Sequence, residues 1–188
     1  MNWKEALDKL KSGNKNYVND SLNSGRAQTG VRNSLTGGQK PFAIILSCAD
    51  SRVAPEQIFD ADLGEVFVIR VAGNIANTSS IASIEYAVAH LGAELIVVLG
   101  HESCGAVGAA LAGGDNGHNL NHLVSHIVPA VTACPGADVN TVVKKNANLN
   151  GDALVERSKI ISAAVNGGKC KIVPAYYSLS NGEVDFEI

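Results

Sequence analysis

Two short clusters of side chains with metal-binding chemistry stand out in this 188-residue chain. The first is Cys48-Ala49-Asp50-Ser51-Arg52, and the second is His101-Glu102-Ser103-Cys104. Two cysteine thiolates and one histidine imidazole form a catalytic zinc set that leaves the fourth position for water or another weak ligand. The residue types therefore predict one zinc ion per chain, held by Cys48, His101 and Cys104. The alternative is that both cysteines are small hydrophobic side chains of the core.

Asp50 and Arg52 lie two positions apart, so in a turn their side chains can point the same way. A carboxylate beside a guanidinium stays ionised and can form a bidentate pair. Next to zinc, Asp50 could fill the fourth coordination position, or it could accept a hydrogen bond from a metal-bound water and orient it. A solvated surface ion pair, worth about 0–1 kcal/mol, is the alternative.

Strands must bring the two clusters together. Three apolar runs without alternation predict strands buried on both faces: Phe42–Ser47, Val66–Arg70 and Leu95–Leu99. Each cluster follows the end of one of these strands, and parallel strands place their carboxyl ends at the same edge of a sheet. A crossover helix is expected over Thr78–Leu91, with Asn77 or Thr78 as its cap and Gly92 closing it.

The remaining elements complete the expected fold. A helix is expected over residues 3–20 with a break near Gly13, followed by an extended connection to residue 39. Further helices are expected over 103–111, 119–133 and 152–166, and the first of these would carry His101 and Cys104 on one side of its first turn. A last strand over 171–179 is confined to an edge or bulge by Pro174, and Asn181-Gly182 predicts a hairpin into 184–188.

These elements predict an α/β fold with a central, mainly parallel β-sheet flanked by helices, an N-terminal helical arm and a C-terminal hairpin or edge strand. Residues 1–188 are expected to form a single domain. Its helical arm and connection span 1–38, and its catalytic α/β core spans 39–188.

Composition excludes several classes of protein. The chain is 46% hydrophobic, with a net charge of −3 and no basic run, so nucleic acid is not an expected partner. No apolar run reaches the ~18 residues of a membrane span, and the charged N-terminus does not fit a secretory signal, so we expect a cytoplasmic protein without a membrane partner. Four cysteines then indicate ligands or buried thiols rather than disulfides.

The motifs resemble those of the β-class carbonic anhydrases. They are Cys48-Ala49-Asp50-Ser51-Arg52-Val53, Gly64-Glu65-Val66-Phe67-Val68-Ile69-Arg70 with Ala72-Gly73-Asn74, and Gly100-His101-Glu102-Ser103-Cys104-Gly105. The similarity is close from Gln39 to Ala110 and weaker towards Gly182. It implies a zinc lyase that reversibly hydrates carbon dioxide to bicarbonate and a proton.

Position by position, the resemblance implies zinc on Cys48, His101 and Cys104, and a catalytic dyad of Asp50 and Arg52 that orients the zinc-bound hydroxide. Substrate-binding positions correspond to Gln39, Phe67, Ala72, Tyr86 and Gly105. The family usually has a bulkier aliphatic residue than Ala72, which implies a wider pocket here. Ile45 replaces a tryptophan of the bicarbonate-controlled members, so Asp50 is expected to pair with Arg52 rather than close the site as a fourth ligand.

The resemblance also implies a homodimer or a larger even-numbered oligomer, with the site at a subunit interface and the N-terminal helix embracing a neighbour. Two alternatives stay open. The same zinc site could hydrolyse carbonyl sulfide or carbon disulfide, or the metal could be structural in a zinc-binding regulatory protein. Three histidines at four-residue spacing, His118, His122 and His126, fit a solvated helix face better than a second metal site. One of them could still relay protons.

Overall fold

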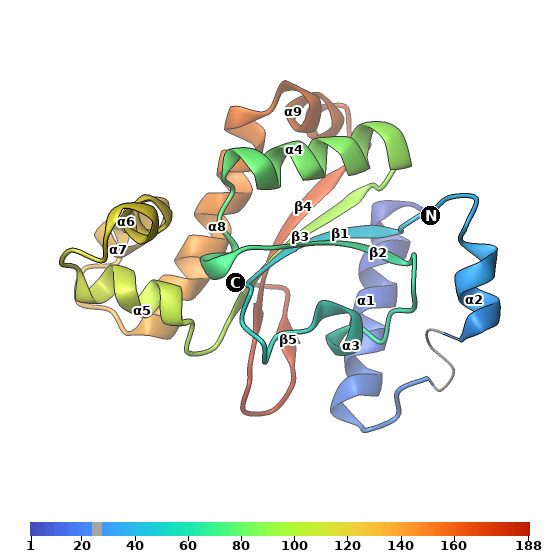
Figure 1. The fold of residues 1–188 in the computed structure, drawn as a ribbon, viewed down its shortest axis with the longest axis horizontal. Helices are drawn as coiled ribbons and strands as arrows, with labels where there is room; N and C mark the ends of the chain where they lie inside the picture. Colours follow the sequence, from blue (N-terminus) through green and yellow to red (C-terminus); the bar gives the residue numbers. More distant parts are fainter. Residues whose placement is uncertain (24–27) are drawn as a thin grey trace.

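The computed structural model describes residues 1–23 and 28–188, and in these residues a five-stranded sheet carries helices on both faces (Figure 1). The strand order is β2-β1-β3-β4-β5. The first four strands run parallel, and β5 is antiparallel to β4. The strands are β1 Ala43–Ser47, β2 Val66–Arg70, β3 Leu95–His101, β4 Lys171–Tyr177 and β5 Val184–Asp185. The predicted fold class is confirmed.

The central strands are buried on both faces, which explains why their sequences lack alternation. Every residue of β1 and β3 is buried. The prediction that Val66–Arg70 is buried on both faces is wrong, because β2 is an edge strand and none of its residues is fully buried. Ala43 and Ile45 of β1 belong to one hydrophobic cluster, whereas Ile44 and Leu46 belong to another on the opposite face. Ser47, the last residue of β1, is level with both Arg70 and Leu99, so the strand ends lie at one edge of the sheet.

Helices cover the sheet in layers around three hydrophobic clusters. The helix α1 (Trp3–Val18) packs on one face, and α4 (Thr78–Tyr86) and α9 (Lys159–Asn166) lie on the other (Figure 1). The long helix α8 (Val139–Arg157) lies against β3 and β4. The other helices are α2 Thr29–Ser34, α3 Pro55–Ile58, η1 Ala72–Asn74, η2 Ala87–Leu91, α5 Gly105–Ala112, α6 His118–Ser125 and α7 Val128–Ala133.

The N-terminal region differs from expectation in two ways. The predicted break at Gly13 is wrong, because α1 runs through it. A Cβ at Gly13 would lie 1.8 Å from the carbonyl oxygen of Phe59, so the glycine permits close packing rather than a turn. The connection predicted as extended contains α2, and its residues 24–27 lie outside the described part. Helix α1 buries Ala6 and Leu10 in the core of its own chain. Its contact with a neighbouring subunit stays a prediction.

Three helix predictions also need correction. Helix α5 begins at Gly105, so His101 and Cys104 precede it instead of sharing its first turn. The predicted helix 119–133 is two helices, with Pro129 in the first turn of the second. Residues 152–166, predicted as one helix, are the end of α8 followed by α9. The first part of α8 was not predicted, because its asparagines are poor helix formers.

The crossover and the C-terminus agree with expectation. The Asn77 side chain caps α4 by accepting from the Ser80 backbone N–H, and Gly92 ends the helical segment in a left-handed conformation. Since β5 pairs only with Tyr176 and Tyr177, Pro174 borders a part of β4 that has no strand on its outer side. Among the described residues, no helix combines the length and apolar composition that a bilayer span requires.

Candidate metal centre

Cys48, His101 and Cys104 converge at the carboxyl edge of the sheet. Cys48 directly follows β1, His101 is the last residue of β3, and Cys104 is the N-cap of α5. All three residues are buried, and their ligand atoms lie within 4.8 Å of one another. Among the described residues, this is the single group of three or more such side chains that is close enough to share a metal ion.

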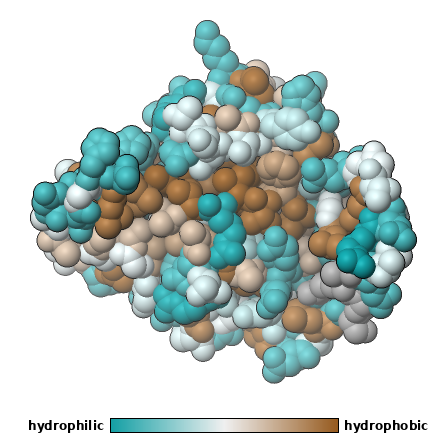
Figure 2. All heavy atoms as spheres, viewed as in Figure 1, coloured by the Kyte–Doolittle hydropathy of each residue, from teal (hydrophilic) through white to brown (hydrophobic). Residues whose placement is uncertain are grey.

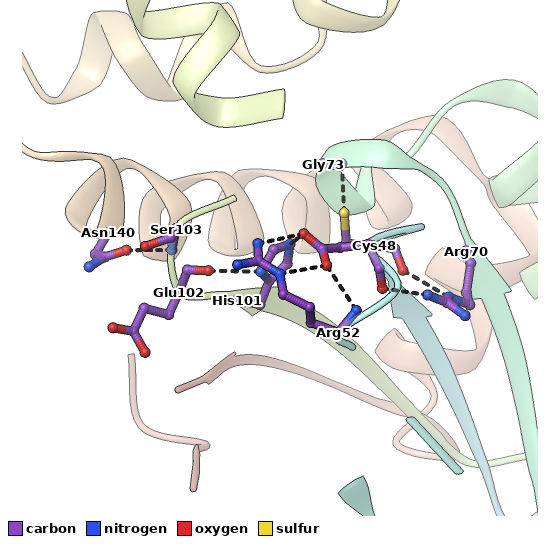
Figure 3. Close-up of polar contacts among 9 residues, drawn as sticks. Cys48, Arg52, Arg70, Gly73, His101, Glu102, Ser103 and Asn140 are labelled. Carbon is purple, nitrogen blue, oxygen red and sulfur yellow. Dashed lines mark hydrogen bonds and ion pairs between the residues drawn. The ribbon is translucent and has the colours of Figure 1, made fainter. Parts of the chain in front are cut away.

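The imidazole of His101 is oriented for coordination by Nε2. Its Nδ1 lies 2.9 Å from the backbone oxygen of Glu102, an acceptor, so Nδ1 carries the proton and Nε2 keeps its lone pair (Figure 3). Nε2 is buried and has no hydrogen-bond partner in the described structure. A buried nitrogen without a partner is costly unless something coordinates it.

The two thiols are coupled. Contact with the Cys104 thiol is the main cause that lowers the pKa of Cys48, and the same contact raises the pKa of Cys104. The pair therefore loses one proton easily and resists losing the second, because two adjacent thiolates repel. The backbone N–H groups of Val107 and Ala106 at the start of α5 act in the opposite direction on Cys104, lowering its pKa, as expected for a helix N-terminus.

This donor set fits zinc. Two buried thiolates and one imidazole nitrogen are the ligands of catalytic Cys₂His zinc sites, where Zn–S is about 2.3 Å and Zn–N about 2.0 Å. A span of 4.8 Å between ligand atoms is within about 1 Å of what such bond lengths require in a tetrahedron. A divalent cation would offset the repulsion between the thiolates and supply the missing partner of His101 Nε2.

Asp50 and Arg52 form a bidentate pair beside the three ligands. Arg52 donates from Nε to Asp50 Oδ1 at 3.0 Å, from Nη2 to Oδ2 at 2.8 Å, and from its backbone N–H to Oδ1 at 2.9 Å. These hydrogen bonds hold the pKa of Asp50 well below its usual range. The Asp50 side chain is 18% exposed, and its Oδ2 lies 3.9 Å from His101 Nε2. Asp50 thus borders the metal centre as an ionised acceptor and is not one of the three grouped ligands.

Several residues that support this arrangement were assigned no role from the sequence, although Arg70 and Gly73 belong to the quoted motifs. Arg70, at the end of β2, donates from Nε to the Cys48 carbonyl and from Nη2 to the Asp50 carbonyl (Figure 3). The Gly73 N–H donates to Cys48 Sγ at 3.4 Å. Asn140 accepts from the N–H of Ser103, which has a positive φ of 55°. Arg70 could have been found from its position, because it ends a strand beside the Cys48 cluster.

The predicted substrate-binding residues do not all gather at this centre. Gly105 begins α5 next to Cys104, and Ala72 lies in η1 next to Gly73. Phe67 is level with Ile44, four residues before Cys48, which is about 13 Å along the strand direction. Its ring packs on Tyr86 of α4 at 6.3 Å, Tyr86 is 51% exposed, and Gln39 is exposed in the loop before β1.

The other candidate side chains stand apart. His118 and His122 lie on α6 and His126 ends it, with the rings of His122 and His126 edge to face at 5.3 Å. They do not belong to a metal-binding group in the described residues. Burial raises the pKa of Cys170 to about 11, as expected for an ordinary buried thiol.

Comparisons with known proteins agree with one another. The family model described as carbonic anhydrase matches residues 43–184. Carbonic anhydrase 2 of Mycobacterium tuberculosis is 39% identical over 184 residues, covering 94% of this chain and 89% of the relative. A carbonic anhydrase of Mycolicibacterium smegmatis is 36% identical over 187 residues, covering 96% and 91%.

Solved structures show the same fold. The Coccomyxa β-carbonic anhydrase in complex with acetazolamide superposes with a TM-score of 0.76 at 25% identity, covering 98% of this chain and 82% of that one. A tetrameric β-carbonic anhydrase of Sordaria macrospora has a TM-score of 0.75 at 24% identity, with coverages of 97% and 94%. Sequence and fold place this chain in the β-carbonic anhydrase family.

Proposed function

We propose that this protein catalyses the reversible hydration of carbon dioxide to bicarbonate and a proton, on a zinc ion held by Cys48, His101 and Cys104. The observation that carries the proposal is the convergence of these three buried ligands beside an ionised Asp50. β-Carbonic anhydrases use zinc, and their general activity is this hydration.

Zinc, when bound, supplies a Lewis acid that makes water acidic enough to be a nucleophile near neutral pH. Asp50 would then accept a hydrogen bond from that water, because Arg52 keeps its carboxylate ionised and its Oδ2 lies 3.9 Å from His101 Nε2. Such a contact would orient a lone pair of the water oxygen towards the carbon of the substrate. Arg70 fixes the backbone of residues 48–50, so the thiolate and the carboxylate keep their relative positions.

The same geometry argues against a structural metal. Structural zinc sites have four protein ligands, whereas three ligand groups converge here among the described residues. Asp50 is the nearest candidate for a fourth ligand, but its carboxylate already accepts three hydrogen bonds from Arg52. An open coordination position suits catalysis. No feature of the described residues favours carbonyl sulfide or carbon disulfide as the substrate.

We further propose an even-numbered oligomer in which a second copy supplies Gln39, Phe67 and Tyr86 to the pocket. Hydrophobic residues gather on the surface over β2 and η1 (Figure 2), where residues 66–69 and 71–72 are only partly buried. A partly exposed apolar edge strand is a typical protein–protein contact. Tyr86 is exposed, and Phe67 lies far from Cys48 of its own chain. Both observations support the proposal that these residues line the pocket of a neighbouring subunit. The Sordaria macrospora relative is tetrameric.

Stopped-flow carbon dioxide hydration between pH 6.5 and 9, with zinc content measured on the same sample, tests the activity. One zinc per chain with turnover that increases towards alkaline pH is expected. One zinc per chain without hydration would favour the structural metal, and preferential carbonyl sulfide turnover would favour the other hydrolase.

Mixed oligomers test the shared site. Cys48→Ala removes a ligand and Tyr86→Ala removes a pocket residue, so each variant alone should be impaired. Reassembled together, they should regain activity, because a Cys48→Ala subunit offers an intact Tyr86 to its partner's intact metal centre. No recovery in mixed oligomers would contradict the shared pocket.

A further inference from the structure

The turn from Gly73 to Ala76 touches the metal centre without contributing a ligand. Its contact is the Gly73 N–H, which donates to Cys48 Sγ at 3.4 Å (Figure 3). The turn has an unusual conformation, because Gly73 has a φ of 72° and Asn74, which is not a glycine, has a φ of 44°. Such a backbone persists only where its surroundings hold it.

Helix α8 holds this turn at both ends through buried amides. Asn146 donates from Nδ2 to the Gly73 carbonyl at 2.9 Å. Asn150 accepts the Ala76 N–H on Oδ1 at 2.6 Å. The two asparagines also contact each other, since Asn150 Nδ2 donates to Oδ1 of Asn146 at 3.0 Å and to its backbone oxygen at 2.8 Å. Arg157, the last residue of α8, also contacts the turn by donating from Nη1 to the Ala76 carbonyl.

The positions of these amides are unfavourable for the helix itself. Asn146 is 1% exposed and Asn150 is 5% exposed, in the middle of a helix that packs on the sheet. Apolar residues would normally fill such positions, and asparagine is a poor helix former. Their four-residue spacing places both on the face that meets the turn. Both amides have hydrogen-bond partners in the turn, so the turn explains their presence.

We propose that Asn146 and Asn150 are positioning residues of the metal centre. They hold the 73–76 turn so that the Gly73 N–H points at Cys48 Sγ, which fixes the orientation of that sulfur and reduces its electron donation to the metal. Hydrogen bonds to ligating groups commonly tune metal sites in this way. The inference rests on the proposed function, because it assumes that Cys48 binds a metal.

Cobalt(II) provides a test that does not depend on catalysis, because its sulfur-to-metal charge-transfer bands report directly on bound thiolates. Asn146→Ala should weaken cobalt affinity about 10-fold and shift these bands. Asn148→Ala is the matched control on the same helix, since the Asn148 side chain donates to Lys144 and Ile188 instead of the turn. Its cobalt affinity should stay within about twofold of wild type.

Asn146→Leu separates positioning from packing. Leucine has the same number and branching of side-chain heavy atoms as asparagine and suits a buried helix position, but it cannot donate to Gly73. It should therefore fold if Asn146→Ala does not, and it should still show weakened cobalt binding and shifted bands. Wild-type cobalt affinity and spectrum in Asn146→Leu would overturn the proposal, as would an equal loss in Asn148→Ala.

Failure of the proposed function would look different. Wild-type protein that shows the thiolate–cobalt bands but does not hydrate carbon dioxide would contradict the activity, and the variants' spectra would still decide the positioning role. Wild-type protein without these bands would overturn both.

Discussion

Replacing Asp50 by asparagine tests the central chemical claim about the site. Asparagine has the same shape and can still accept from the Arg52 backbone and Nε, but it carries no charge and presents an NH₂ group where Oδ2 now accepts from Arg52 Nη2. The variant therefore loses an ionised acceptor 3.9 Å from His101 Nε2 while the surrounding chain keeps its packing.

The expected effect on activity is large, and the effect on folding is small. A positioned acid–base group contributes about 10²- to 10⁴-fold to a rate, or about 3–5 kcal/mol of barrier. The Arg52 side chain is 54% exposed, so the pair is screened by solvent and contributes little to stability. Because the pKa of Asp50 is lower in the folded protein, this stabilisation is present above the carboxylate's unfolded pKa. It decreases as the pH falls below the unfolded pKa and is fully lost once the pH has fallen through the folded pKa.

Stopped-flow hydration and zinc content should be measured on Asp50→Asn and on Asp115→Asn. Asp115 is a matched control, because its carboxylate also accepts hydrogen bonds locally, from Gly117 and Asn121, but lies outside the metal centre. We expect both variants to hold one zinc and only Asp50→Asn to lose turnover. Unchanged turnover in Asp50→Asn would refute the assigned role, and loss of zinc would show that Asp50 helps to bind the metal.

Two substitutions and one labelling experiment have clear expected results. Gly73→Ala should destabilise the fold and lower the zinc content, because φ of residue 73 is 72° and the new Cβ would lie 2.6 Å from Ile127 Cδ1. The backbone strain alone costs about 1–2 kcal/mol, which urea unfolding can measure. Gly13→Ala should lower the midpoint of urea unfolding, since its Cβ would overlap the Phe59 carbonyl. The control Gly30→Ala should not lower it, because a Cβ there meets no atom within 4 Å. Equal midpoints in the two variants would contradict the packing role of Gly13. The native Cys170 thiol should react slowly with a thiol reagent at pH 8, because burial raises its pKa to about 11, and fast labelling of this residue by mass spectrometry would contradict its burial.

Elements defined by local patterns were predictable. The unbroken apolar runs of β1 and β3 identify parallel strands buried on both faces, whereas the similar run of β2 belongs to a partly exposed edge strand. Asn77 and Gly92 mark the ends of the helical segment between β2 and β3. Helix α8 was only partly predictable, because its buried asparagines satisfy hydrogen bonds with a turn some seventy residues away. No local pattern reveals such a partner. Gly13 was misinterpreted for the same reason, since its contact is with the distant Phe59.

The sequence by itself determined the chemistry of the site: two thiols, one imidazole and an Asp–Arg pair after strand ends that must meet in a parallel sheet. Only the tertiary structure decided how these groups are oriented. It places His101 Nδ1 on the Glu102 carbonyl, commits Asp50 to Arg52, and aims the Gly73 N–H at Cys48. Ligand type depends on which atoms a side chain carries, but orientation depends on contacts between segments far apart in the chain, which no short stretch of sequence contains.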